Sequence, residues 1–129
     1  MTAGQVAAAG RREAAALFQD ACRIERAGES TASDGGVDSE TTTVLYEGPC
    51  RLRETARAVS ADSSGQAPVE TWQYTVSVPV TVTAVRSYDA VVITASADPS
   101  AVELRLRVRS VGRGTHITAR RLGCEEVSR

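Results

Sequence analysis

Apolar and polar residues alternate without a break from Trp72 to Ala84, in the segment WQYTVSVPVTVTA. A period of two places successive side chains on opposite faces of a β-strand, so this segment predicts a long strand with one face toward a core. Pro79 stands in the middle of the segment and has no N–H to donate to a neighbouring strand. We therefore expect an edge, a bulge or a break there, and we favour a strand that bends and passes from one sheet to another.

Several shorter segments also carry β-strand patterns. Cys22–Arg26 and Cys50–Glu54 resemble each other and can pair as neighbouring strands. Thr41–Tyr46 is rich in β-branched residues, and its strand is expected to resume at Cys50 after a kink at Gly48–Pro49. The remaining predicted strands are Ala90–Ser96, Leu104–Arg109 and Thr115–Val127, the last with Ile117 and Ala119 inward and a bulge near Arg120–Arg121.

Residues 2–20 are predicted to form a helix, with Thr2 as its N-cap. Gly10 weakens the middle of this helix by about 1 kcal/mol relative to Ala. The apolar surface of this helix is narrow and rich in alanine, so we expect it to pack closely against a sheet or a neighbouring subunit. Alone in water such a helix would be only marginally stable. The apolar stripe consists of Val6, Gly10, Ala14, Leu17, Phe18 and Ala21.

These elements predict a mainly β fold, either a small β-barrel or a sandwich of six to seven antiparallel strands, preceded by an N-terminal α-helix. A length of 129 residues suits one domain spanning residues 1–129. Within it, residues 22–127 are expected to form the barrel. Residues 28–40 and 56–68 are expected to be mobile loops, because they are rich in Ser, Thr, Gly and acidic residues and have little to bury.

The charge balance argues against a protein that holds nucleic acid by bulk electrostatics. The net charge is −1, whereas such proteins carry a clear basic excess. All 15 basic residues are arginine, which suits ion pairs between subunits, although the coding bias of a GC-rich genome also accounts for it. No apolar run is long enough to span a membrane, and the N-terminus lacks the pattern of a signal peptide. We expect a protein made and used in a cytoplasm.

The sequence offers little for catalysis or metal binding. Cys22, Cys50 and Cys124 are far apart and odd in number, so they are expected to be free, buried thiols. The one histidine, His116, lies in a predicted strand, and an extended chain of about 3.3 Å per residue would separate it from Cys124 by roughly 26 Å. A nucleophile–base pair needs direct contact. No phosphate-binding loop or metal-ligand spacing is present. We expect no enzymatic activity, no cofactor and no metal.

One predicted strand has an arginine face. Arg105, Arg107 and Arg109 alternate with apolar residues, and Arg113, Arg120 and Arg121 follow nearby in the sequence. Three interpretations stay open. The arginines form a solvated face paired with acids of the same or a neighbouring subunit, they contact another subunit, or they lie near nucleic acid as in an OB-like module. The last is weakened because Trp72 and the tyrosines are not interleaved with these arginines.

Three segments together resemble a known family. They are Tyr74–Val85, Val91–Pro99 with Asp89 before it, and Thr115–Val127. The order and spacing of these segments, together with the N-terminal helix and the corner at Gly48–Arg51, resemble those of the head-closure, or stopper, proteins of tailed phages. The resemblance covers nearly the whole chain, and no single motif within it is diagnostic.

The resemblance implies a virion protein of the phage neck, assembled in the host cytoplasm. Its copies would form a six- or twelve-fold ring between the portal or adaptor protein and the tail terminator or tail tube, with genomic DNA passing through the channel without sequence recognition. It also implies a loop that blocks the channel before the tail docks. The candidate gating loops are residues 56–68 and 28–40, and we favour the first because it joins two predicted strands and is long and poor in apolar residues. Its candidate gating residues are Ala56, Arg57, Ser60, Asp62, Ser63, Ser64, Gly65 and Gln66.

A ring needs two different patches on each subunit that meet between neighbours. The arginine residues Arg105, Arg107, Arg109, Arg120 and Arg121 are candidates for one half, and the acidic residues Glu29, Asp34, Asp38 and Glu40 for the other. Charge reversal at Arg105 and Arg107 is then expected to impair assembly and leave the fold intact. Two alternatives remain, a tail terminator or adaptor ring of the same neck, and an OB-like nucleic-acid-binding module.

Overall fold

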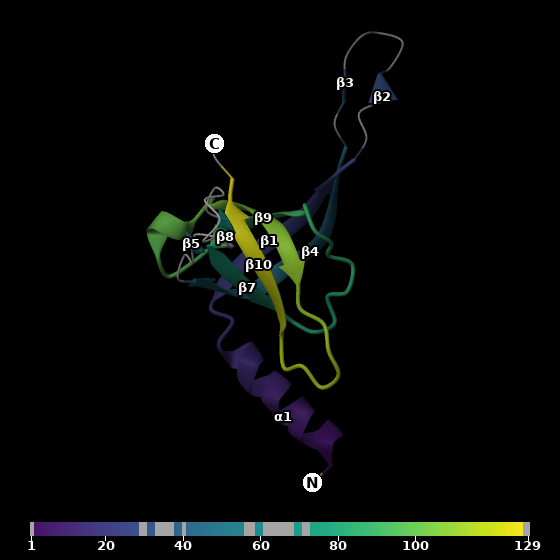
Figure 1. Ribbon diagram of the computed structural model, residues 1–129, viewed down its shortest axis with the longest axis vertical. Helices are drawn as coiled ribbons and strands as arrows, with labels where there is room; N and C mark the ends of the chain where they lie inside the picture. The colour runs from purple at the N-terminus through teal and green to yellow at the C-terminus, as the bar shows by residue number, and fades with distance from the viewer. Residues whose placement is uncertain are drawn as a thin grey trace.

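The fold is a closed antiparallel β-barrel of six strands with one helix at the N-terminus (Figure 1). The computed structural model describes residues 2–28, 31–32, 38–39, 41–55, 59–60, 69–70 and 73–127. Around the barrel the strands follow the order β1–β4–β7–β10–β9–β8, and β8 closes the circle by pairing with β1. The strands are β1 (Asp20–Ala27), β4 (Thr42–Glu54), β7 (Tyr74–Val78), β8 (Ala90–Ala95), β9 (Arg105–Val111) and β10 (Arg120–Glu126). The predicted mainly β fold is confirmed, as a barrel.

Small aliphatic side chains and three thiols fill the barrel. Strand alternation sends every second side chain inward, and the residues that point inward are the apolar ones. The three cysteines are free and fully buried, as predicted, and act as small apolar side chains. The fully buried members of the core are Cys22, Ile24, Cys50, Val76, Val78, Val91, Ile93, Leu106, Val108, Leu122 and Cys124.

Strand β4 runs through Gly48–Pro49 without ending. Its first half pairs with β1, where Ala21 faces Pro49, and its second half pairs with β7 from Arg51 onward. Pro49 therefore lies where the strand changes partner, which is where a missing N–H disturbs the ladder least. β1 and β4 are neighbours, but the predicted match of their two similar segments is wrong, because Cys22–Arg26 lies against residues 43–48.

The long predicted strand ends at Pro79 instead of bending through it. β7 stops at Val78, and residues 79–89 form turns and irregular structure up to β8. The expectation that the strand passes into another sheet is wrong, because Val78 pairs with the first residue of β10 and Pro79 cannot continue that ladder. Val82 and Val85 nevertheless stay buried, so the alternation beyond Pro79 serves to close one end of the barrel.

The C-terminal strands follow the predicted alternation with different bounds. In β9 the residues Leu106 and Val108 are buried and the arginines between them are exposed, as expected. The last strand begins at Arg120 rather than Thr115, and His116 lies in a turn with φ of 60°. Ala119 is buried as predicted, whereas Ile117 is only half-buried. The bulge falls between Gly123 and Cys124, not near Arg120–Arg121.

The helix α1 spans Ala3–Ala16 and is shorter than the predicted 2–20. Thr2 caps it as expected, since its hydroxyl accepts from the Gln5 N–H while the Gln5 side chain accepts from the Thr2 N–H. The predicted apolar stripe is confirmed in part. Gly10 and Ala14 are half-buried, but Val6 is 55% exposed, and the buried residue of α1 is Ala7, which lies outside the stripe. The chain reaches β1 through Leu17–Gln19, so α1 extends away from the barrel (Figure 1).

Short strand pairs extend two of the barrel connections. β2 (Thr31–Ala32) pairs with β3 (Asp38–Ser39) between β1 and β4, and β5 (Val59–Ser60) pairs with β6 (Val69–Glu70) between β4 and β7. The β2–β3 pair lies at the opposite end of the molecule from α1 (Figure 1). Both predicted mobile loops thus contain paired strand residues, and the rest of each loop lies outside the described residues. A short 3-10 helix, η1 (Pro99–Ala101), precedes β9.

Candidate interaction surfaces

The arginines of β9 face solvent but have acidic partners within the same chain. Arg105 contacts Glu25 of β1 at 3.1 Å, between Nη2 and Oε1. Arg109 and Arg107 lie 3.6 and 4.0 Å from the Oε1 atom of Glu125 on β10. Of the three interpretations drawn from the sequence, the arrangement fits the first, a solvated strand face paired with acids of its own subunit. Such surface pairs contribute only about 0–1 kcal/mol each.

Arg120 and Arg121 point to different surroundings, although they are neighbours in sequence. Arg120 is half-buried, and its Nη1 and Nη2 donate to the carbonyl oxygens of Gly112 and Val80 at 2.9 and 2.8 Å. It therefore joins the turn before β10 to the segment after β7. Its Nε is buried without a hydrogen-bond partner among the described residues. Arg121 lies on the outer face of β10 and is exposed.

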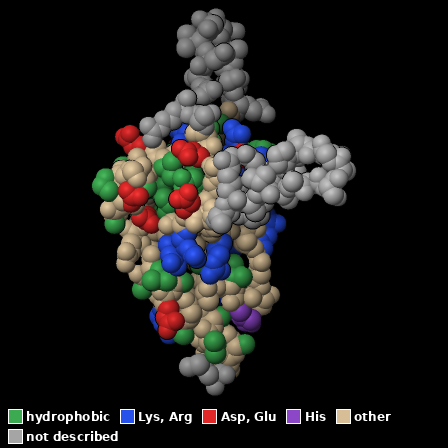
Figure 2. Space-filling model, turned by 60° about the vertical axis from the view of Figure 1, so that its left-hand side comes forward, with side chains coloured by type: hydrophobic (Ala, Val, Ile, Leu, Met, Phe, Trp, Pro, Cys, Tyr) green, Lys and Arg blue, Asp and Glu red, His purple; other side chains and the backbone are tan. Residues whose placement is uncertain are grey.

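A cationic pocket lies on the outer face of β4, β7 and β10. Ser77 of β7 pairs with Arg51 of β4 on one side and with Arg121 of β10 on the other. Two residues away on the same face of the sheet, Thr75 pairs with Arg53. The pocket has a volume of about 230 Å³. Figure 2 shows basic side chains gathered above α1, with acidic side chains gathered above them. We call this site the arginine pocket, lined by Arg51, Arg53, Arg121, Thr75, Ser77, Thr55, Ala119, Ala14, Leu17 and Phe18.

The arginine pocket is not neutralised from within the described part of the chain. No ion pair there joins Arg51, Arg53 or Arg121 to a carboxylate, in contrast to the arginines of β9. Sequence reasoning separated these three arginines because Arg51 and Arg53 belong to a segment far from Arg121. The signal was the alternation of Arg51 and Arg53 with Cys50 and Leu52, but only the barrel order brings β10 to the same face.

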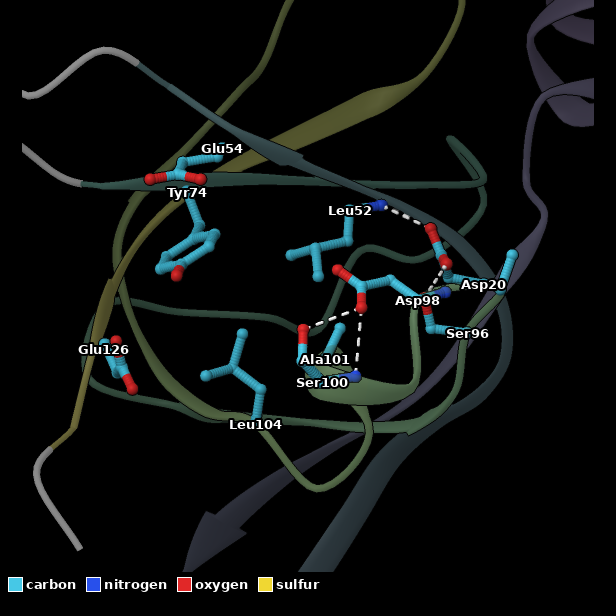
Figure 3. A pocket seen from close by; sticks show the side chains of 11 residues that line it. Asp20, Leu52, Glu54, Tyr74, Ser96, Asp98, Ser100, Ala101, Leu104 and Glu126 are labelled. Carbon is cyan, nitrogen blue, oxygen red and sulfur yellow. Dashed lines mark hydrogen bonds between the residues drawn. The ribbon is translucent and has the colours of Figure 1, made fainter.

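One end of the barrel opens into a pocket with four carboxylates, which we call the acidic mouth. It has a volume of about 460 Å³ and includes Asp20, Glu54, Asp98 and Glu126. Figure 3 shows these side chains arranged around the opening, with Leu52, Tyr74 and Leu104 between them. Burial, together with the nearby carboxylates of Glu126 and Glu54, raises the pKa of Tyr74.

Two carboxylates of the acidic mouth hold local structure. Asp20 accepts from the Ser96 hydroxyl at 2.7 Å and from the Leu52 N–H at 2.9 Å, so it fixes the start of β1 between β4 and the end of β8 (Figure 3). Asp98 accepts from the hydroxyl and the N–H of Ser100 at 2.7 and 3.0 Å, and these bonds lower the pKa of Asp98. Asp98 is thereby the cap of η1.

An ion pair between a buried carboxylate and a partly exposed guanidinium holds the other end of the barrel, and sequence reasoning missed it. The Arg26 guanidinium meets the Asp89 carboxylate through two hydrogen bonds of 2.8 and 2.9 Å, and Arg26 also donates to the Ala84 carbonyl. Asp89 is 3% exposed and accepts a further bond from the Arg86 N–H. The hydrogen bond to Asp89 raises the pKa of Arg26. The pair ties the end of β1 to the segment before β8.

The groups considered for catalysis lie in different environments. His116 is exposed in a turn, whereas Cys124 is inside the barrel, where burial raises the pKa of its thiol to about 12. Contact with Cys22 and burial raise the pKa of Cys50 as well. A thiol with a raised pKa is a poor nucleophile at neutral pH. Within the described ranges, no three His, Cys, Asp or Glu side chains form a metal-binding group.

The candidate gating and acidic residues fall mostly where the structure gives no description. Ser60 lies in β5 and Asp38 in β3. The others lie outside the described residues, namely Ala56, Arg57, Asp62, Ser63, Ser64, Gly65, Gln66, Glu29, Asp34 and Glu40. In the part of the chain that is described, no helix combines the length and the apolar character needed to cross a bilayer.

Comparison with known proteins identifies one family. Residues 10–125 match DUF6093, which is described as a family of unknown function. No curated protein and no solved structure matches the chain significantly. The match covers the barrel and the C-terminal half of α1.

Proposed function

The chain belongs to the DUF6093 family, and we propose that it is a structural, non-enzymatic subunit of the neck of a tailed phage. In this role its copies form a closed ring between the portal or adaptor protein and the tail. The ring closes the DNA-filled head and offers the surface on which the tail docks. The resemblance described above motivates the proposal, and the surfaces of the barrel support it.

The observation that carries the proposal is the weak attachment of α1 to its own barrel. Ala7 is its buried residue, and among the described residues one hydrogen bond joins α1 to the rest of the fold, from Arg11 Nε to the Ile117 carbonyl at 3.0 Å. Val6 and Leu17 are 55% and 50% exposed. A helix of 14 residues is marginal in water without packing. A partner that covers α1 therefore suits a subunit made for assembly.

The distribution of charge also supports an assembling subunit, but through other residues than the sequence suggested. The arginines of β9 already face Glu25 and Glu125 of their own chain. The arginine pocket and the acidic mouth are two separate, oppositely charged surfaces. Two different patches that meet between neighbours are what a closed ring requires. Many weak contacts repeated around such a ring become strong through avidity.

Ring formation is tested with the full chain, alone and with the portal complex of its phage, by negative-stain imaging and native mass measurement. A Val6→Ser, Leu17→Ser variant should lose the rings, because the apolar surface of α1 becomes polar. Val44→Ser is the matched control, since Val44 is 51% exposed on β4, away from α1. The control should assemble like the unaltered chain.

Two results would count against the proposal. One is a Val6→Ser, Leu17→Ser variant that assembles as well as the unaltered chain. The other is a chain that stays monomeric even with the portal complex and binds single-stranded DNA with an affinity that falls steeply with salt, which is the behaviour of an OB-like module.

A further inference from the structure

The arginine pocket concentrates positive charge that the described residues do not neutralise. Arg51 and Arg121 flank Ser77 from the two strands beside β7, and Arg53 lies next to Thr75. Positively charged guanidinium groups held side by side repel one another, so an anion that enters between them stabilises the arrangement. The arginines of β9 lack this property, because Glu25 and Glu125 already lie against them.

The donors in the pocket suit a carboxylate. Each guanidinium presents planar pairs of N–H groups that match the two oxygens of a carboxylate or the oxygens of a phosphate. Thr75 and Ser77 add hydroxyls to the floor between the arginines. A volume of about 230 Å³ is below the range of about 300–1,000 Å³ typical of small-molecule sites, so it holds one or two side chains.

The rim of the pocket is apolar on the side of α1. Ala14, Leu17 and Phe18 form this rim, and Leu17 is half-exposed. An aliphatic side chain placed on the rim would cover Leu17 while a neighbouring carboxylate reaches the arginines. A peptide offers both groups within a few residues, whereas a nucleic-acid backbone offers phosphates without an aliphatic group.

The surroundings also disfavour a polyphosphate chain. Glu54 follows Arg53 directly in β4 and belongs to the acidic mouth, with Glu126 at the end of β10. A strand of nucleic acid long enough to run past the ends of β4 and β10 would meet the carboxylates of the acidic mouth after leaving the arginines, and like charges repel. A short peptide that ends within the pocket avoids them.

We propose that the arginine pocket is a docking site for an acidic peptide segment of a protein partner, with glutamate or aspartate side chains on Arg51, Arg53 and Arg121 and an aliphatic side chain on Leu17. The site shares Leu17 and the arginines with the contact proposed for the ring, but peptide binding is measured on the isolated chain and does not require ring formation. It holds whether or not the chain is a neck protein.

The test is an NMR titration of the full ¹⁵N-labelled chain with the capped peptide Glu-Glu-Leu-Glu-Glu-Leu. We expect shifts centred on the amides of β4, β7 and β10 around the pocket, and little change along β9. A peptide with Gln in place of Glu should lose binding, and one with Ser in place of Leu should bind more weakly. A thymidine hexanucleotide serves as the nucleic-acid arm.

Matched variants separate the pocket from general charge. The double variant Arg51→Gln, Arg121→Gln should bind the glutamate-containing hexapeptide about tenfold or more weakly, because two charge-assisted contacts are lost. Arg105→Gln with Arg107→Gln removes the same charge from β9 and should leave the affinity unchanged. Circular dichroism confirms that both variants fold.

Three outcomes would overturn the assignment. The first is an absence of shifts around the pocket at millimolar peptide. The second is equal weakening by the two variants, which would mean that net charge alone drives binding. The third is a hexanucleotide that shifts the same amides with equal or higher affinity than the peptide, which would assign the pocket to nucleic acid.

Discussion

Each cysteine of the chain lies inside the barrel, where its thiol is shielded from solvent. Cys22, Cys50 and Cys124 are 0% exposed, and burial raises the pKa of Cys124 to about 12. Only a thiolate that reaches the reagent attacks a disulfide. We expect all three thiols to be unreactive toward Ellman's reagent at pH 8 in the native state and to react fully in denaturant. Rapid release of chromophore from the native chain would contradict this arrangement.

The buried carboxylate of Asp89 is the residue on which the closed end of the barrel depends. Replacing it by Asn keeps the shape but removes the charge that Arg26 meets, and one of the two oxygens becomes a donor facing N–H groups. We expect Asp89→Asn to lower Tm by several degrees in thermal unfolding followed by circular dichroism.

Asp98→Asn is the matched control for this change, because Asn caps a helix about as well as Asp and residue 98 is exposed. Its Tm should be close to that of the unaltered chain. Equal Tm values for the two variants would show that the Arg26–Asp89 pair does not hold the fold.

At the scale of elements, the contact between α1 and the turn before β10 depends on a glycine. A Cβ on Gly10 would come within 2.6 Å of the Thr118 side chain. On helix propensity alone, Gly10→Ala would stabilise the helix by about 1 kcal/mol. We expect the reverse, because the added methyl pushes α1 off residues 117–118. Hydrogen exchange of the α1 amides should speed up.

Gly4→Ala provides the comparison, since a Cβ at Gly4 meets nothing closer than the Thr2 hydroxyl at 3.9 Å. In this variant the exchange of the α1 amides should be unchanged or slower. If Gly10→Ala also slows exchange, then propensity outweighs the contact and α1 is not seated as described.

The elements that the sequence predicted well are those with uninterrupted alternation. β9 alternates between apolar residues and arginines, and its buried and exposed residues follow that pattern. The strand predictions failed at the two prolines, since one strand ends where continuation was predicted and the other continues where a kink was predicted. Pro79 ends β7 because it cannot continue the ladder with β10 beyond Val78, while Pro49 is tolerated where β4 changes partner. These outcomes depend on pairing between distant segments, which the local pattern does not contain.

The candidate surfaces were harder to predict for the same reason. The arginine face of β9 was visible in the sequence, but its neutralisation by Glu25 and Glu125 depends on the barrel placing β1 and β10 near β9. The arginine pocket likewise needs β4 and β10 on either side of β7. The helix stripe was wrong at Val6, because the first half of α1 lies beside the turn at residues 116–118, where Ala7 and not Val6 is covered.

For the whole molecule, the raised pKa values of a buried thiol and a half-buried tyrosine hydroxyl predict a loss of stability at alkaline pH. The pKa values of Cys124 and Tyr46 are raised by burial from 9.0 and 10.0 to about 12. Well below pH 9 both groups are neutral in the folded and unfolded chain. As the pH rises from about 9 toward 12, the Cys124 thiol ionises in the unfolded chain first, so the free energy of unfolding falls by up to roughly 1.4 kcal/mol per pH unit. The half-buried Tyr46 hydroxyl adds a smaller loss above about pH 10, because solvent screens its charge.

Urea unfolding between pH 7 and pH 11 measures this loss. The midpoint should be constant up to about pH 8, because an unfolded thiol with a pKa of about 8.5 begins to ionise there, and should then decrease. A midpoint that stays level to pH 11 would show that these groups ionise as easily in the folded chain as in the unfolded one, and so that the barrel interior admits water.

The whole molecule combines a rigid barrel with a helix and charged surfaces that its own fold leaves uncovered. The barrel fills its interior with side chains and keeps α1, the arginine pocket and the acidic mouth on the outside. We propose that neighbouring subunits cover these surfaces. The account of the chain as a neck subunit depends on that contact taking place in a particle.

The most direct measurement is cryo-electron microscopy of tailed particles from a phage or prophage that carries this gene, with a matched deletion of the gene. We predict a closed ring of these barrels between portal and tail, with α1 packed against a neighbour. In the deletion we predict heads without tails, either still filled with DNA or emptied by leakage of the genome. Complete tailed particles that form without the chain, or a neck that lacks its density, would contradict the account.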